Sequence, residues 1–192
     1  MTKEYQILGI SGSLRKASYN TGLLRAAQEL LPEGMRLELA DISQFPLYNE
    51  DVSSMGLPEA VKIFQAQIRA ADGLMIATPE YNFSIPGVLK NAIDWASRPL
   101  QGQPFDGKPV AILGAGGRMG TVRAQVHLRQ IAVFLNMHPL NRPEVLIQQA
   151  RDKFDADGNL TDTAARQAVK DLLVALAGWI ARLEPKEVST IG

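Results

Sequence analysis

The chain has no cysteine, and it has only 2 histidines among its 192 residues. Without thiols it forms no disulfides, iron–sulfur clusters or thiolate zinc sites, and no cysteine acts as a nucleophile. Its 20 basic and 20 acidic residues cancel, so the whole chain carries no electrostatic signature of a nucleic-acid or anionic-membrane partner. We therefore expect no nucleic-acid partner, no membrane partner and no metal site.

Long hydrophobic runs are also missing. The longest uncharged apolar stretch, 172–181, is about half of the roughly 20 residues that a membrane-spanning helix needs. The apolar run at 7–10 is too short for the core of a secretory signal. These observations predict a cytoplasmic protein. The length and the 46% hydrophobic content suit one globular domain, and we expect it to span 1–192.

Short apolar runs alternate with segments of helical periodicity along the chain. Strands are predicted at 5–10, 36–41, 72–78, 108–114 and 137–140, with 144–147 as a further piece of the last one. Helices are predicted at 20–31, 58–71, 86–97 and 121–135, with a final helix that Thr161 caps and that ends at Leu183. This alternation predicts a doubly wound α/β fold, in which helices cover both faces of a five-stranded parallel sheet.

Ligands of such folds bind beyond the carboxyl ends of the strands, so the loops that follow the strands carry the functional signal. The first loop, 11–20, combines three serines with Arg15 and Asn20 and opens onto a helix N-terminus. Free backbone N–H groups and the helix dipole favour an anion there, which indicates a phosphate monoester held mainly by hydrogen bonds. A plain turn with helix-capping serines is the alternative.

The second loop, 78–87, places Tyr81 and Phe83 between two prolines. Aromatic side chains beside a rigid backbone suit a flat heteroaromatic ligand, although the same residues also suit packing against the end of the sheet. The third loop, 114–120, has four glycines and allows the backbone to approach a ligand closely. It does not match a dinucleotide fingerprint, because Met119 stands where the third glycine is required.

A serine hydrolase is a weaker interpretation. Gly9-Ile-Ser11-Gly-Ser13 resembles a nucleophile elbow whose final glycine is replaced by serine. His127 lies inside a predicted helix between arginines, and we interpret it as structural. The acidic stretch 155–159 is interpreted as a polar turn rather than a calcium loop.

Three segments together resemble the NADPH-dependent FMN reductase family, in particular its bacterial quinone and chromate reductases. They are Gly12-Ser-Leu-Arg-Lys-Ala-Ser-Tyr-Asn20, the stretch from Pro79 to Trp95, and Arg123-Ala-Gln-Val-His-Leu-Arg-Gln130. The resemblance runs from about Tyr5 to Leu183. It implies a flavodoxin-like fold with strand order 2-1-3-4-5, non-covalent FMN, and NADPH or NADH as electron donor.

The resemblance also implies a set of site residues. Those expected to hold the FMN phosphate end are Ser11, Ser13, Leu14, Arg15, Ser18 and Asn20. Those expected beside the isoalloxazine are Pro79, Glu80, Tyr81, Asn82, Gly114, Gly116 and Gly117. Tyr81 is also the candidate for contacting substrate at the catalytic face. Arg118 and Arg98 are the candidates for anionic acceptors.

The implied activity has two half-reactions, in which NAD(P)H reduces bound FMN and an acceptor then takes the electrons. Quinones are the expected acceptors, with chromate as a further one. Relatives in the family imply a homodimer or homotetramer. An FMN-binding electron carrier without NAD(P)H activity is the alternative, which the zero net charge disfavours because such carriers tend to be acidic.

Overall fold

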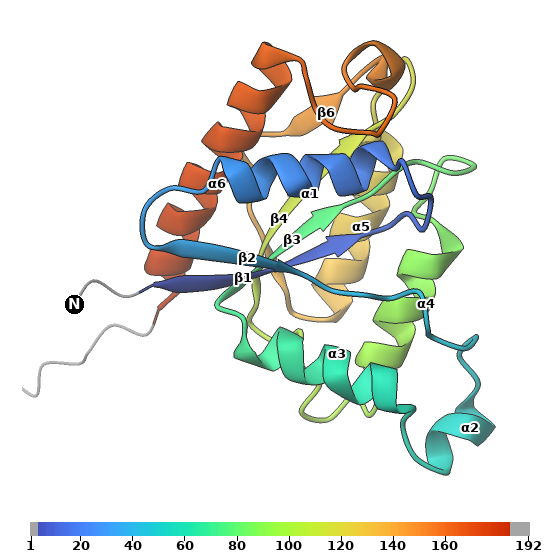
Figure 1. Cartoon of the computed structure of the whole chain (residues 1–192). Helices are drawn as coiled ribbons and strands as arrows, with labels where there is room; N and C mark the ends of the chain where they lie inside the picture. The colour runs from blue at the N-terminus through green and yellow to red at the C-terminus, as the bar shows by residue number, and fades with distance from the viewer. Residues whose placement is uncertain (1–3, 185–192) are drawn as a thin grey trace, which may run out of the picture.

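A parallel β-sheet forms the centre of the computed structural model, which describes residues 4–184 (Figure 1). Its strands run in the order β2-β1-β3-β4-β5, so the predicted order is confirmed. The strands are β1 (Tyr5–Ser11), β2 (Met35–Leu39), β3 (Gly73–Ala77), β4 (Pro109–Ala115), β5 (His138–Pro139) and β6 (Val145–Ile147). Strands β3 and β4 are buried along their whole length, as expected for strands that helices cover on both faces.

The predicted last strand is divided into two short pieces on the same side of β4. Strand β5 pairs with Pro109 and Val110 at the start of β4, and β6 pairs with residues 113–115 at its end. Between them lies the segment 140–144, where Pro143 has no N–H to donate to a ladder. The fifth position of the sheet is therefore shared by two strands.

Helices cover both faces of the sheet (Figure 1). Their bounds are α1 (Tyr19–Glu29), α2 (Glu50–Ser54), α3 (Glu59–Ala70), α4 (Gly87–Ala96), α5 (Val122–Phe134) and α6 (Thr163–Leu183), with a 3-10 turn at Ala150–Asp152. Helices α1 and α6 pack on one face, where Leu23 and Leu176 are fully buried. Helices α3, α4 and α5 pack on the other, around Phe64, Leu89 and Leu128.

The structure corrects several element boundaries. Asp162, not Thr161, is the N-cap of the last helix, because its carboxylate accepts a hydrogen bond from the Ala165 N–H at 2.8 Å. Helix α1 begins at Tyr19, one residue earlier than expected, since the Ser18 hydroxyl caps it. The short helix α2 and the 3-10 turn were not predicted, because neither is long enough to show helical periodicity. The predicted single domain over 1–192 extends past the described residues and stays a prediction.

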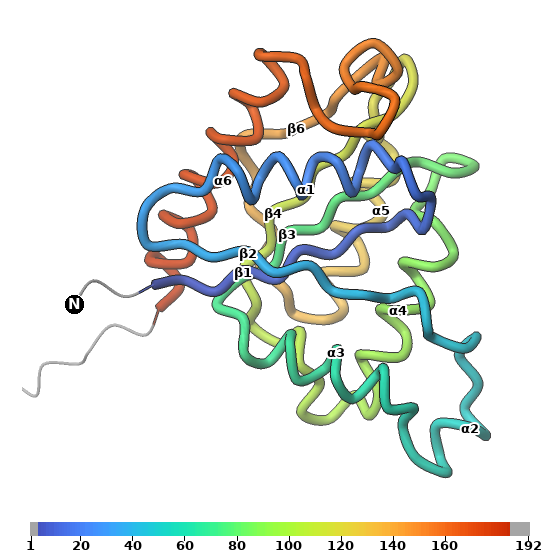
Figure 2. Tube along the Cα trace, in the orientation of Figure 1, coloured from blue at the N-terminus to red at the C-terminus, as the bar shows by residue number. Residues whose placement is uncertain are grey.

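The sheet register determines where the three loops lie. Ser11 at the end of β1 is level with Ala77 at the end of β3, and Ala77 is level with Leu113 near the end of β4. The loops after these strands therefore leave from one edge of the sheet (Figure 2). The chain reverses its direction across the sheet between β1 and β3, which is the switch point where doubly wound folds bind ligands. Within residues 4–184 no helix combines the length and apolar character needed to cross a membrane.

Candidate functional site

The first loop joins β1 to α1 and is held by its own hydroxyl groups. The Ser11 and Thr21 hydroxyls lie 2.7 Å apart, and the Ser11 hydroxyl oxygen accepts from the Ser13 N–H at 3.3 Å. The Ser13 hydroxyl oxygen accepts from the Arg15 N–H at 3.3 Å. A cavity of about 250 Å³ lies between this loop and the end of β2, lined by Ser11, Ser13, Leu14 and Thr21 among others.

Unpaired donors remain in this loop. Among the described residues, the backbone N–H groups of Leu14, Lys16 and Ala17 have no hydrogen-bond acceptor, and they lie directly before the N-terminus of α1. The side chains of Leu14 and Arg15 are exposed. Because free N–H groups, a guanidinium and a helix N-terminus all favour an anion, the loop fits the phosphate end of a mononucleotide.

Ser18 and Asn20, two predicted phosphate ligands, are buried and already have protein partners. The Ser18 hydroxyl caps α1 by accepting from the Thr21 N–H at 3.3 Å. The Asn20 amide donates to the Ala115 carbonyl at 3.0 Å and accepts from the Ala115 N–H at 2.9 Å. Helix capping, the alternative that the serine-rich sequence allowed, therefore describes Ser18. The phosphate contacts of both residues stay predictions.

The second loop forms a tight turn that exposes aromatic rings. Tyr81 and Ser84 exchange backbone hydrogen bonds of 2.9 and 3.0 Å, and the two residues between them, Asn82 and Phe83, both have positive φ (51° and 64°). Two such residues in a two-residue hairpin are typical of a type I′ turn, which asparagine tolerates and phenylalanine rarely adopts. Tyr81 is 53% exposed and Phe83 is 64% exposed, so neither ring packs into the sheet as the alternative interpretation had it.

Glu80 connects this turn to helix α5. Its carboxylate accepts from the Arg123 side chain at 2.8 Å and from the backbone N–H groups of Arg123 and Ala124 at 2.9 and 3.3 Å. The carboxylate thereby caps α5, whose own N-cap residue, Thr121, makes no side-chain capping bond. Burial opposes ionisation of Glu80, but the hydrogen bonds from Arg123 and Ala124 outweigh it and lower its pKa.

Arg123 reaches the aromatic turn as well. Its guanidinium carbon lies 3.9 Å from the centroid of the Phe83 ring, within the range of a cation–π contact. Nearby, His127 on α5 places its Nδ1 3.0 Å from the Ser84 hydroxyl. Helix α5 therefore holds the turn through residues 80, 83 and 84, which leaves Tyr81 as its ring without such a contact among the described residues.

The glycines of the third loop serve different purposes. A Cβ on Gly114 would overlap the Thr121 hydroxyl and the Thr78 carbonyl oxygen, and a Cβ on Gly116 would overlap the Gly120 carbonyl oxygen. These two glycines are required by packing within the protein. Gly117 is exposed and has no atom within 4 Å of the position of a Cβ, so it alone of the three predicted glycines leaves room for a ligand.

The two arginines predicted to bind anionic substrates lie in different places. Arg118 is exposed beside Gly117 in the third loop. Arg98 follows the C-terminal end of α4, a 10-residue helix that extends about 15 Å from its start beside the aromatic turn. The Arg98 guanidinium donates to the Ser97 hydroxyl at 3.2 Å and lies 5.5 Å from the Tyr48 ring. The structure thus brings Arg118, but not Arg98, to the three loops.

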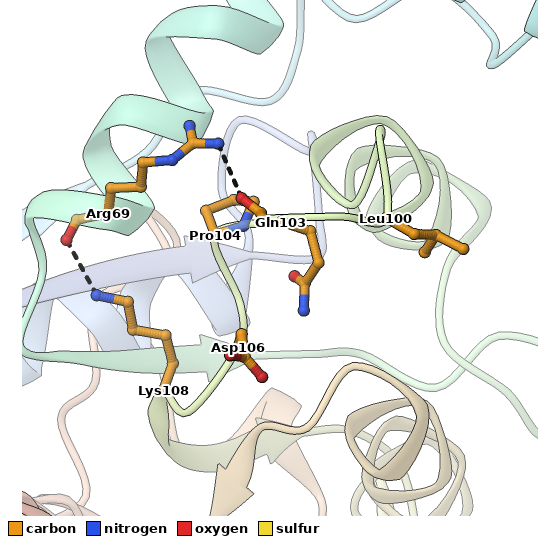
Figure 3. Close-up of a pocket in the computed structure, with 7 residues that line it drawn as sticks. Arg69, Leu100, Gln103, Pro104, Asp106 and Lys108 are labelled. Carbon is orange, nitrogen blue, oxygen red and sulfur yellow. Dashed lines mark hydrogen bonds between the residues drawn. The ribbon is translucent and has the colours of Figure 1, made fainter.

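A larger cavity, about 560 Å³, lies at the opposite edge of the sheet (Figure 3). Its cationic side chains are bonded to the protein itself. Arg69 donates to the Gly102 carbonyl at 3.3 Å, and the Lys108 ammonium donates to the Arg69 carbonyl at 3.0 Å. Asp106 accepts from the Asn136 amide at 2.7 Å. Lys108 caps carbonyl groups at the C-terminal end of α3, and we interpret the residues that line this cavity as structural.

Comparison with known proteins identifies the family of this chain. The model of the family described as NADPH-dependent FMN reductase matches residues 5–152. The chain belongs to this family. An NAD(P)H-dependent FMN reductase of Pseudomonas aeruginosa is 60% identical over 184 residues, which cover 95% of this chain and 99% of that protein. An NADPH:quinone oxidoreductase of Arabidopsis thaliana is 46% identical over 187 residues, covering 94% of each chain.

A solved structure extends the likeness to three dimensions. The flavoenzyme NAD(P)H:(acceptor) oxidoreductase FerB of Paracoccus denitrificans aligns with a TM-score of 0.84 and 34% identity over 93% of this chain and 98% of that one. The flavodoxin-like fold is thus confirmed, as is the dependence of this FMN reductase on FMN and NAD(P)H. The individual contacts to these cofactors stay predictions.

The sequence-based list missed three groups that shape this FMN reductase site. Thr21 pairs with Ser11, Arg123 joins Glu80 to Phe83, and His127 meets Ser84. All three lie on helices, where the periodic pattern describes only which face is buried. Arg123 and His127 fell inside a segment that resembled the family, but nothing in that pattern indicates which side chains they contact.

The glycine loop generates a first prediction. Gly114→Ala should lower the free energy of unfolding by about 1–3 kcal/mol, because the added methyl overlaps Thr121 and Thr78. Gly117→Ala is the matched control and should change it by less than about 0.5 kcal/mol, since that position is open. Urea unfolding of both variants measures this, and equal losses would contradict the assignment.

The cap that Glu80 forms on α5 leads to a second prediction. Glu80→Gln should cost about 1–3 kcal/mol of stability at pH 7, because a charged acceptor for three donors is lost. The folded-state pKa of Glu80 lies below its ordinary value of 4.5, so its ionised form stabilises the fold above that pH. The difference between wild type and variant should shrink as the pH falls through the folded-state pKa. Urea unfolding from pH 7 to 3 tests this, and a difference independent of pH would refute it.

Proposed function

We propose that this chain is an FMN-dependent NAD(P)H oxidoreductase that reduces quinones. The family match over residues 5–152 supports the cofactor and the electron donor. Relatives named quinone reductases support the acceptor, among them a 2-hydroxy-1,4-benzoquinone reductase of a Burkholderia species, 42% identical over 176 residues, which cover 91% of this chain and 96% of that protein. The observation that carries the proposal is the meeting of the anion-binding loop, the aromatic turn and the open glycine at one sheet edge.

Each loop has a part in this proposal. Arg15 and the free N–H groups of the first loop would bind the phosphate of FMN. The backbone of residues 79–82 would line the ring, and the exposed Tyr81 would contact the substrate. Bound FMN supplies the hydride and electron transfer that no side chain of this protein can perform. The protein would bind and orient the FMN, and it leaves one side of the site open at Gly117.

The alternatives have weaker support. An FMN-binding electron carrier without NAD(P)H activity is not favoured by the family or by the named relatives. A hydrolase with a Ser-His-Asp triad needs a histidine beside its nucleophile. The Ser11 hydroxyl instead lies against Thr21, and within residues 4–184 no histidine contacts Ser11.

Chromate and homo-oligomerisation belong to this proposal as extensions. Arg118, exposed in the third loop, would attract an anionic acceptor such as chromate. Exposed apolar side chains on α5, namely Val126 (57%), Val133 (81%) and Phe134 (72%), support the predicted homodimer or homotetramer. A cytoplasmic location stays a prediction from the sequence.

The proposed activity is tested by two-substrate kinetics with NADPH and a quinone. Double-reciprocal plots should give parallel lines, because the donor leaves before the acceptor binds at the same open side. Purified protein should also carry a visible flavin spectrum that NADPH bleaches without oxygen. Intersecting lines would contradict the shared site, and absence of NADPH oxidation would favour the electron carrier.

The role of Arg118 is tested by its substitution. Arg118→Ala should lower kcat/KM for chromate by about 2- to 5-fold more than for a neutral quinone, because one exposed positive charge is lost. Arg118→Lys keeps the charge and should largely restore the chromate rate. Arg98→Ala should have the smaller effect, since Arg98 lies on Tyr48. Equal losses on both acceptors would eliminate the electrostatic role.

A further inference from the structure

Arg15, which with Lys16 is one of two exposed cations in the first loop, is held by an aromatic stack. Its guanidinium carbon lies 4.7 Å from the centroid of the Tyr19 ring. Tyr19 in turn lies against Phe154, with ring centroids 4.8 Å apart and planes inclined by 33°. Phe154 is 8% exposed and belongs to the hydrophobic core under α1 and α6. A buried ring therefore supports a half-buried ring, which supports the arginine.

Phe154 belongs to a short hairpin, residues 153–162, that follows the last strand. Phe154 and Leu160 form its bridge, and Lys153 and Asp162 form an ion pair of 2.6 Å at its base. The Asp155 carboxylate accepts from the N–H groups of Asp157 and Asn159 at 3.0 and 2.8 Å. Hydrogen bonds within the turn therefore stabilise its conformation. The family match ends at residue 152, just before this hairpin.

The hairpin is docked on the first loop and on α1 (Figure 2). A Cβ on Gly22 would overlap the Gly158 carbonyl oxygen, and a Cβ on Gly158 would lie 2.9 Å from the backbone of Ala17. Gly158 also has φ of 78°, which glycine adopts without strain. Arg25 on α1 donates to the carbonyl of Gly158 at 2.9 Å and to the Asn159 side chain at 3.1 Å. Gly22 and Gly158 therefore allow a close approach, Arg25 bonds the hairpin to α1, and Gly158 lies against Ala17 in the loop that carries Arg15.

We propose that the hairpin 153–162 positions Arg15 for the FMN phosphate through the ring pair of Tyr19 and Phe154. An arginine side chain on a surface loop loses considerable rotamer freedom when it binds. Stacking on Tyr19 restricts that freedom before the ligand arrives, so less is lost on binding. Tyr19 and Phe154 are then positioning residues that act only through Arg15. The inference rests on the proposed phosphate role of Arg15.

The test compares FMN with riboflavin, which has the same ring but no phosphate. Full-length protein loaded with either flavin is diluted, and the fluorescence of released flavin gives each dissociation constant. Tyr19→Leu and Phe154→Leu should each raise the dissociation constant of FMN by about 2- to 5-fold and leave that of riboflavin unchanged. Tyr19→Phe keeps the ring and should behave like wild type.

Arg15→Ala separates the inference from the function beneath it. It should weaken FMN binding by on the order of tenfold, with little effect on riboflavin binding. Adding Tyr19→Leu or Phe154→Leu to it should cause no further loss that is specific to FMN. If Arg15→Ala leaves the ratio of the FMN and riboflavin dissociation constants unchanged, its phosphate role is wrong. If it raises that ratio and the ring variants do not, only the positioning role is overturned.

Equal weakening of both flavins by the ring variants would also overturn the proposal, because it would indicate general damage to the fold. Tyr19→Leu alone decides the matter should Phe154→Leu fail to fold, since Tyr19 is only partly buried.

Discussion

The hydrogen bonds between the Asn20 amide and Ala115 join the first loop to the third. One buried side chain satisfies both the N–H and the C=O of a residue at the end of β4. Helix α1 begins one residue before Asn20, so these bonds set the distance between the helix N-terminus and the glycine loop. Loss of the amide would leave two buried backbone groups unpaired, which proteins rarely tolerate. The position of the first loop relative to the open Gly117 is therefore fixed by these two hydrogen bonds.

The second loop is held by a different interaction. Glu80 caps α5 from outside the helix, and its ion pair with Arg123 places a guanidinium on Phe83. These contacts, together with the backbone hydrogen bonds between Tyr81 and Ser84, offset the strain of a phenylalanine with positive φ. The turn exposes Tyr81 at the edge of the sheet where the loops after β1 and β3 leave the strands. An enzyme whose chemistry comes from a bound flavin needs this kind of fixed, open site.

The outer layer of the site is formed by residues far away in the sequence. The hairpin 153–162 lies against the loop 11–18 through Gly158 and Ala17, although more than a hundred residues separate them. Arg15, Tyr19 and Phe154 form one stack across this contact. The segment beyond the family match is thus part of the architecture around the proposed phosphate site.

By itself the sequence determined the alternation of strands and helices, the three loops and the family, because hydrophobic periodicity and local motifs are short-range properties. Strand order came from the family resemblance, and the register of β1, β3 and β4 confirmed that the loops meet. Only the tertiary structure decided that Ser18 and Asn20 serve the protein backbone, that Gly117 alone of three glycines is open, and that Arg98 lies away from the loops. Each of these depends on which distant group fills the space beside a residue, and that information lies in the packing of the whole chain.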